Sequence, residues 1–343
     1  MQYAVQCSTI AAHDGCVNDD DYGKPLAMKS DQPKRHHYVP RFYLRRFACS
    51  NDLNKLMILE RRHDFLVADR KSIDYVGYEE GLHDYHNDGK PASIECEINR
   101  AIETPFASSS TWSKISAGAC ASLTEQDKLP IYMFARHLQR RNLETLRFIE
   151  AESARVQAEG FDASFNEEER DMYRWIATSV EGARTLFHDG ALDTMPPADA
   201  NRINVMVCQS PIALRSSTNP TLTVSCPGTE SIFGPIFNSL RTWWLTLDRH
   251  WGALIVAGGP PGFTINAMPI DAARMINRRY LVQQLNSLSV TYLIADDERL
   301  AEDLEWAGYR FEQYTKHGYR YRKIVSSPDS EVDRRKTTQA RQS

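Results

Sequence analysis

The chain has 343 residues, with 41 basic and 45 acidic side chains, which gives a net charge of −4 when histidine is neutral. Charged residues make up 25% of it and hydrophobic ones 42%, a composition typical of a globular protein with one or two domains. This composition excludes a collagen, a coiled-coil rod and a wholly disordered chain. No apolar run approaches the roughly 18 residues of a transmembrane helix, so no membrane association is expected. A uniformly basic nucleic-acid binder is not expected either.

Cysteine usage and the chain ends indicate where the protein acts. The seven cysteines include no Cys-x-x-Cys pair, which argues against a disulfide framework and a zinc ribbon. The N-terminus carries no basic segment followed by an apolar one, so we predict a cytoplasmic location. Residues 1–33 are expected to be a disordered leader and residues 326–343 a disordered polar tail. Residues 34–325 are predicted to form a single globular domain.

The first half of this domain indicates helices that follow one hairpin. Two apolar runs, Lys55–Glu60 and Phe65–Ala68, flank four polar residues and predict a β-hairpin. Isoleucines spaced four apart predict a helix over residues 93–104. A capping threonine opens a long helix that runs over residues 124–157, and another helix is predicted over Glu167–Leu186.

The second half changes to strands separated by proline and glycine. Its β-rich runs are Asn204–Val207, Thr221–Ser225, Leu240–Leu247 and Gly252–Ala257. Residues Asp271–Leu285 return to helix, and Val290–Ala295 is either a buried strand or the last turn of that element. This segregation predicts an α+β fold, with a helix-rich first half packed against an antiparallel or mixed sheet formed largely by the second half. No dinucleotide fingerprint or phosphate loop occurs, and no cofactor is predicted.

The densest chemical signal is the segment Arg35–Phe47, which combines basic side chains with aromatic rings. Pro40 suits the first turn of a short helix there. Its neighbours His36 and His37 could act as acid–base groups, because histidine titrates near neutral pH. The alternative is that the aromatic rings dock the helix on the core and the charges pair at the surface.

Four arginines are candidate phosphate ligands. Arg41 and Arg45 share one face of the short helix, and Arg140 and Arg141 lie on the predicted long helix. A guanidinium can hold a phosphate through two parallel hydrogen bonds. Glu144, four residues after Arg140, could instead neutralise the helical face.

Residues 36–47 resemble the HHYVPxFYLxxF motif that opens the bacterial and fungal domain-of-unknown-function family catalogued as four-two-three-eight. Four further segments are similar to features of that family. Lys55–Glu60 resembles a short strand of the family, and Met133–Asn142 resembles a helix that contains an arginine. Ser217–Pro220 resembles a Ser-Asp-Asn-Pro turn, and Asn266 resembles the start of a helix that contains an asparagine. The resemblance covers about residues 35 to 300. Thr218 stands where the family usually has aspartate, and Asn142 stands near its usual proline. The resemblance implies a fold and no established reaction.

These residues predict a phosphate-directed protein that binds or processes nucleic acid or a nucleotide in one His/Arg cleft. The predicted catalytic residues are His36, His37 and Asn219, and the predicted substrate-binding residues are Arg41, Arg45, Arg140 and Arg141. The alternative is a non-catalytic interaction protein whose motif residues only brace the fold.

A third interpretation is a metal-dependent nuclease. The pattern His36-His37-x-x-Pro40 is also similar to the first motif of HNH nucleases, in which His37, Asn54 and His63 would surround a divalent metal ion. The strand predicted after Asn54 weighs against this, because that motif needs a helix there.

Two other clusters have weaker signals. Residues Leu82–Asp88 contain two histidines and two aspartates that could bind a metal, although a surface turn is favoured. Trp243 and Trp244 alternate in a predicted strand and so face opposite sides. A stacking platform for bases needs more than one exposed ring, so core packing is favoured for both.

Overall fold

The computed structural model describes residues 35–87, 90–160, 167, 180–194, 200–224, 241–287, 289–316 and 318–324. All of them belong to one unit that begins at Lys34, and the description concerns this unit. The predicted leader and tail lie outside the described residues, as does most of the helix predicted over Glu167–Leu186.

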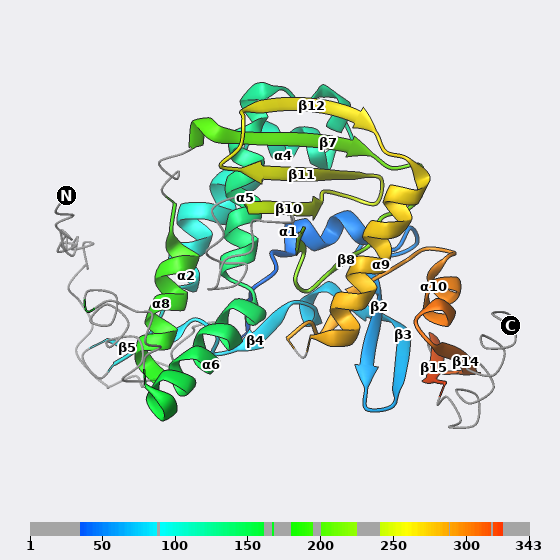
Figure 1. Cartoon of the computed structure of the whole chain (residues 1–343), viewed down its shortest axis with the longest axis horizontal. Helices are drawn as coiled ribbons and strands as arrows, with labels where there is room; N and C mark the ends of the chain where they lie inside the picture. The colour runs from blue at the N-terminus through cyan, green and yellow to red at the C-terminus, as the bar shows by residue number, and fades with distance from the viewer. Residues whose placement is uncertain are drawn as a thin grey trace, which may run out of the picture. The chain divides into compact units, whose positions relative to one another are not determined.

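Two larger sheets organise the unit (Figure 1). The strands are β1 (Arg35–His37), β2 (Lys55–Arg62), β3 (Phe65–Ser72), β4 (Tyr78–Glu80), β5 (Asp84–Asn87), β6 (Lys90–Ser93), β7 (Ile203–Gln209), β8 (Ser216–Ser217), β9 (Thr221–Thr223), β10 (Arg241–Thr246), β11 (Trp251–Ala257), β12 (Gly262–Ala267), β13 (Tyr292–Ile294), β14 (Tyr309–Tyr314) and β15 (Gly318–Lys323). The five-stranded sheet has the order β12-β7-β11-β10-β9, and the six-stranded sheet has the order β14-β15-β3-β2-β13-β8.

The helices come from both halves of the sequence. They are α1 (Arg41–Leu44), α2 (Glu95–Ile98), α3 (Thr104–Ala107), α4 (Ser110–Ser116), α5 (Lys128–Arg140), α6 (Leu143–Glu159), α8 (Val180–Leu192), α9 (Ile270–Asn286) and α10 (Leu300–Trp306). The fold is therefore α+β, as predicted.

The five-stranded sheet is formed entirely by the second half of the chain. Its strands pair antiparallel except β12 and β7, which are parallel, so the sheet is mixed as expected. Ile203, Val205 and Val207 alternate inward along β7 and join the core that the helix α5 covers. The ring of Tyr132 on α5 stacks 5.6 Å from that of Trp243 on β10.

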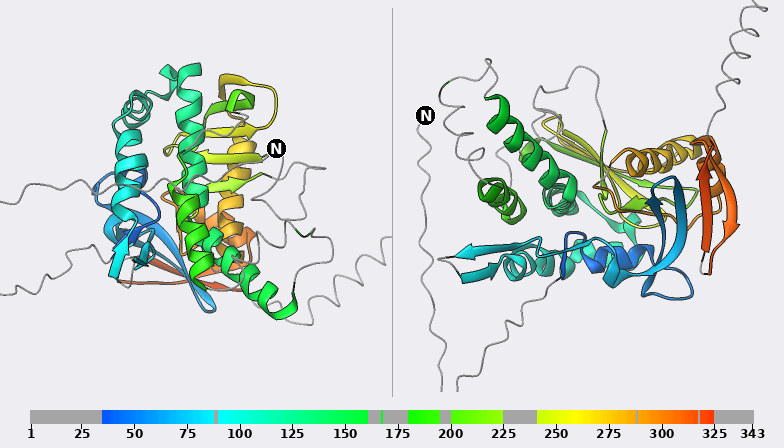
Figure 2. Two further views of the ribbon diagram at one scale, coloured as in Figure 1. Left: turned by 90° about the vertical axis from the view of Figure 1, so that its left-hand side faces the viewer. Right: turned by 90° about the horizontal axis from the view of Figure 1, so that it is seen from below.

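The six-stranded sheet joins segments from opposite ends of the chain. The hairpin β2–β3 is confirmed, with Lys55 opposite Ser72 and Arg62 opposite Phe65. β15 then pairs antiparallel with β3, which places the blue and the red-orange hairpins of Figure 2 side by side. This sheet takes two of its six strands from the first half, so the two larger sheets are formed largely by the second half, as predicted.

Two local expectations are corrected, and the structure decides between the two alternatives left for a third segment. The long helix predicted over residues 124–157 is two helices, because Asn142 ends α5 and caps α6 by accepting a hydrogen bond from the Thr145 main-chain nitrogen at 2.8 Å. Asn266 lies within the strand β12 and is not at a helix start, since α9 begins at Ile270 after Pro269. Val290–Ala295 contains the strand β13 and is not the last turn of a helix.

The part of the chain that the structure describes contains no helix that is both long enough and apolar enough to span a bilayer.

Candidate functional site

His36 is a buried structural residue. Its Nδ1 accepts a hydrogen bond from the His83 main-chain nitrogen at 2.9 Å, and its Nε2 lies 3.5 Å from an Asp84 carboxylate oxygen. The two histidine rings stack with 5.6 Å between their centroids. These contacts clamp the strand β1 to the turn before β5 and leave the imidazole without access to a ligand.

His37 is also held inside the protein. Its main-chain carbonyl accepts a hydrogen bond from the guanidinium of Arg141. Burial, helped by the positive charge of Arg41, lowers the pKa of His37 to about 4. The imidazole is therefore neutral at physiological pH.

Arg141 is the centre of a buried network and is not free for a substrate. Its guanidinium pairs with Glu103 and lies 3.8 Å from Glu95 and 3.1 Å from the Nε2 of His137. Burial lowers the pKa of Arg141 to about 10. This guanidinium is occupied by carboxylates of the protein, so it braces α5 against β1 and α2.

Of the other three predicted arginines, Arg41 lies close enough to His37 for its charge to lower the pKa of that residue, and Arg140 is held by a different partner. Arg140 pairs with Asp193, which also accepts a hydrogen bond from Arg136 at 2.6 Å. Arg41 forms an exposed pair with Asp74 at 3.1 Å, and Arg45 is exposed on the same short helix. The neutralising partner of Arg140 is thus Asp193, and the expected pairing with Glu144 does not form.

The three residues of the nuclease interpretation are spread along the hairpin. Asn54 directly precedes β2 and His63 directly follows it, so eight strand residues separate them. At about 3.3 Å per residue they lie on the order of 25 Å apart, which is too far to share one metal ion. The segment after Asn54 is a strand, as the sequence predicts, and the helix that the motif requires is not there.

Metal binding also lacks support around Leu82. Among the described residues, no three His, Cys, Asp or Glu side chains are placed to hold a metal ion. His83 is buried between the rings of His36 and Phe187, while Asp88 lies outside the described residues. Trp243 and Trp244 are both buried, which confirms core packing.

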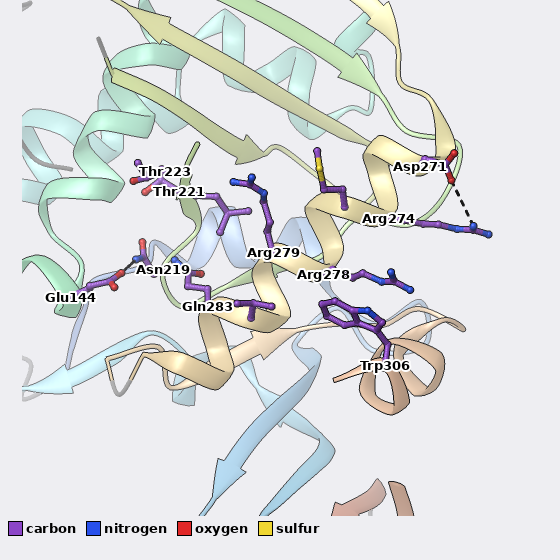
Figure 3. A pocket seen from close by; sticks show the side chains of 13 residues that line it. Glu144, Asn219, Thr221, Thr223, Asp271, Arg274, Arg278, Arg279, Gln283 and Trp306 are labelled. Atoms are coloured by element: carbon purple, nitrogen blue, oxygen red, sulfur yellow. Dashed lines mark hydrogen bonds and ion pairs between the residues drawn. The ribbon is translucent and has the colours of Figure 1, made fainter. Parts of the chain in front are cut away.

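One of the predicted residues, Asn219, lines a pocket of about 850 Å³ at the exposed face of α9 (Figure 3). The pocket is bounded by α9, by β9, by the first turn of α6 and by Trp306. Its apolar wall comes from the side chains of Leu222, Met275 and Val282. None of the other predicted catalytic or substrate-binding residues lines it.

One end of this pocket is rich in hydrogen-bond acceptors. Asn219 follows the strand β8, and its Nδ2 donates to the carboxylate of Glu144. The Oδ1 of Asn219 and the Oγ1 of Thr221 have no partner among the described residues, although these side chains are only 6% and 4% exposed. The surrounding protein also raises the pKa of Glu144 above its usual range. Buried polar atoms without partners are costly, so a hydrogen-bond donor placed at this end of the pocket would stabilise both oxygens.

The helix α9 contributes three arginines with different partners. Arg274 lies 3.7 Å from Asp271, and Arg278 donates to Asp303 at 2.8 Å while stacking over the ring of Trp306. Arg279 has no hydrogen bond or ion pair to any residue in the described ranges and extends from α9 toward β9 in Figure 3. Among the described residues that line the pocket, Arg279 is therefore the one cation without a partner.

Sequence reasoning missed these arginines. The signal was three arginines within six residues of a predicted helix, which is ordinary for a solvated surface. Their different partners come from segments distant in sequence, so only the tertiary structure separates Arg279 from the other two.

Comparison with known proteins finds a family that part of the chain resembles. Residues 35–201 match the family model described as "Protein of unknown function (DUF4238)". No curated protein and no solved structure matches the chain. The match includes the opening His36–Phe47 motif and the helix that carries Arg140, and it ends before the Ser217–Pro220 turn and Asn266. Residues 35–201 are therefore similar to the DUF4238 family.

Proposed function

We propose that the protein binds a phosphorylated small molecule of nucleotide size in the pocket beside α9, with Arg279 as the anchor for the phosphate. The observation that carries this proposal is the guanidinium of Arg279, which lines the pocket without a partner among the described residues. Arginine presents its donors in a planar fork that matches phosphate geometry. Arg274 and Arg278, on the same helix, already have carboxylate partners.

The acceptor-rich end of the pocket supports a ligand with hydroxyl or amino groups opposite its phosphate. Glu144, Asn219 and Thr221 offer oxygen atoms there. Ribose hydroxyls and the amino group of a base are donors that would satisfy those oxygens. The pocket volume of about 850 Å³ lies within the range typical of small-molecule sites.

This proposal moves the phosphate site away from the predicted His/Arg cleft. His36, His37 and Arg141 are engaged with the protein itself, which supports the alternative that the motif residues brace the fold. Asn219 keeps a ligand-binding role in this proposal. The expected cytoplasmic location would give the pocket access to phosphorylated metabolites.

The test is calorimetric titration of the full chain with adenosine 5′-monophosphate. We expect the wild type to bind and Arg279→Ala to weaken binding at least tenfold, because a charge-assisted hydrogen bond is lost. Arg310→Ala is the control: it removes the same charge from an exposed residue that does not line the pocket, and it should bind like the wild type. Equal losses in the two variants, or no binding of any phosphorylated probe by the wild type, would contradict the proposal and favour an interaction protein.

A further inference from the structure

A row of side chains crosses one face of the six-stranded sheet, away from the α9 pocket. In the pairing of β14, β15 and β3, Tyr314 on β14 lies opposite Tyr319 on β15, and Tyr319 lies opposite Ala68 on β3. Opposite residues of antiparallel strands point to the same side, and alternation puts Arg70 on that side too. Met57, opposite Arg70, extends the row onto β2. Figure 2 shows the two hairpins that form this face side by side.

A bulge gives the hairpin β14–β15 its exposed rings. The register of β14 shifts between Phe311 and Gln313, so Glu312 is the extra residue. The shift returns Tyr314 to the side of Phe311, and their ring centroids are 5.1 Å apart. Tyr314 is 76% exposed, Phe311 44% and Tyr319 42%. Three neighbouring rings therefore face solvent. A stacking platform for bases needs more than one exposed ring, and these three provide it, whereas the tryptophans Trp243 and Trp244 are buried.

Positive charge surrounds the two tyrosines. Lys55, Arg70 and Lys316 line a depression of about 590 Å³ together with Tyr314 and Tyr319, and no Asp or Glu lines it among the described residues. Lys55 pairs with Asp52 at 3.3 Å, at the margin of the depression. In the described ranges, Arg70 and Lys316 have no carboxylate partner. A local basic patch thus stands out on a chain whose net charge is −4.

We propose that this face, defined by Lys55, Arg70, Tyr314, Lys316 and Tyr319, binds single-stranded nucleic acid. Unpaired bases stack on exposed tyrosines, and the neighbouring cations contact the phosphates that link those bases. A duplex hides its bases in its own stack, and an acidic peptide gains little from aromatic rings, so the rings favour the single strand. This role is separate from the α9 pocket and does not depend on it.

The test measures fluorescence anisotropy of a labelled oligothymidine of about twelve nucleotides at low salt, with the full chain. We expect Tyr314→Ala to weaken binding about tenfold and Tyr314→Phe to keep it, because stacking needs the ring and not the hydroxyl. Arg70→Ala should weaken binding and reduce the slope of log affinity against log salt by about one. Arg310→Ala is the matched control, because alternation puts Arg310 on the opposite face of the same hairpin. Arg279→Ala should leave this binding unchanged.

Several outcomes would overturn the proposal. If the wild type does not bind the oligothymidine at low salt, the face is not a nucleic-acid site. If a folded Tyr314→Ala variant binds as well as the wild type, bases do not stack on Tyr314. Equal affinity for a duplex or for polyglutamate means that the face is not a single-strand site. Equal losses in Arg70→Ala and Arg310→Ala mean that net charge alone drives binding. The unfolding midpoint of each variant, measured in urea, checks that the fold is intact.

Discussion

The guanidinium of Arg141 donates a hydrogen bond to the main-chain carbonyl of His37. This bond joins the residue that follows α5 to the strand β1, across 104 residues of sequence. It shows how one buried side chain holds the opening motif against the end of α5. The guanidinium also pairs with Glu103 and lies 3.8 Å from the carboxylate of Glu95, while its Nε has no hydrogen-bond partner among the described residues.

We predict that Arg141→Met destabilises the protein by about 3–5 kcal/mol, because the substitution leaves buried carboxylates without their cation. Arg41→Ala should cost less than about 1 kcal/mol, since its pair with Asp74 is exposed. Urea denaturation of both variants measures the difference. Similar free energies of unfolding for the two would show that Arg141 carries no special structural role.

Stability should fall as pH drops from about 6.5 to about 4. Burial lowers the pKa of His37 and of His137 to about 4 and that of His83 well below its usual value. In the unfolded chain these groups titrate near 6.5, so between the two values the unfolded state binds protons that the folded state excludes. Above pH 6.5 the histidines are neutral in both states and their contribution to stability is complete.

The loss at pH 5 should be about 2 kcal/mol for each histidine with a folded pKa near 4. His37→Gln removes one titrating group and should reduce the fall between pH 7 and pH 5 by about that amount. Urea denaturation at both values measures it. A variant whose pH dependence equals that of the wild type would mean that His37 is protonated in the folded protein.

Phe47→Ala should cost about 3–5 kcal/mol, because its buried ring packs edge-on against Tyr43 at 5.2 Å and leaves a cavity when removed. Leu53→Ala is the control, since Leu53 is exposed and should change stability by less than about 0.5 kcal/mol. Thermal and urea unfolding of both variants give the comparison. An unchanged midpoint for Phe47→Ala would place the ring in a void or at the surface.

Gly252→Ala should destabilise the five-stranded sheet by about 1–3 kcal/mol. A Cβ at Gly252 would overlap the indole ring of Trp244, which is buried and donates to Thr246 at 3.0 Å. Gly190→Ala, in the helix α8 with open space around it, should instead stabilise the protein by about 0.4–1 kcal/mol. Opposite signs of the two changes in unfolding free energy are the expected result, and a neutral Gly252→Ala would contradict it.

Elements with strong local patterns were predictable from the sequence, and exposed edges were not. The hairpin β2–β3 and the helix α9 follow their apolar periodicity and were placed correctly. The strand β12 has no buried residue and is exposed from Thr264 onward, so it shows no alternation and was not predicted. β14 is an edge strand with exposed residues after Tyr309, and it was missed for the same reason.

The candidate site residues also differ in whether the sequence alone could identify them. Asn219 was identified only because the turn Ser217–Pro220 resembles the Ser-Asp-Asn-Pro turn of the family. The histidines were expected to act on a ligand, and they are held by contacts with His83, Asp84 and Arg141 that no local pattern reveals. Arg279 differs from Arg278 only in its tertiary partners, so the sequence offers no basis for choosing between them.

The central claim, that Arg279 holds a ligand phosphate, is tested most directly by a thermodynamic cycle. Calorimetry would compare adenosine 5′-monophosphate with adenosine, in the wild type and in Arg279→Ala. The account predicts that removing the phosphate weakens binding to the wild type at least tenfold and changes binding to the variant little. An equal loss in both proteins would show that the phosphate does not contact Arg279 and would contradict the account.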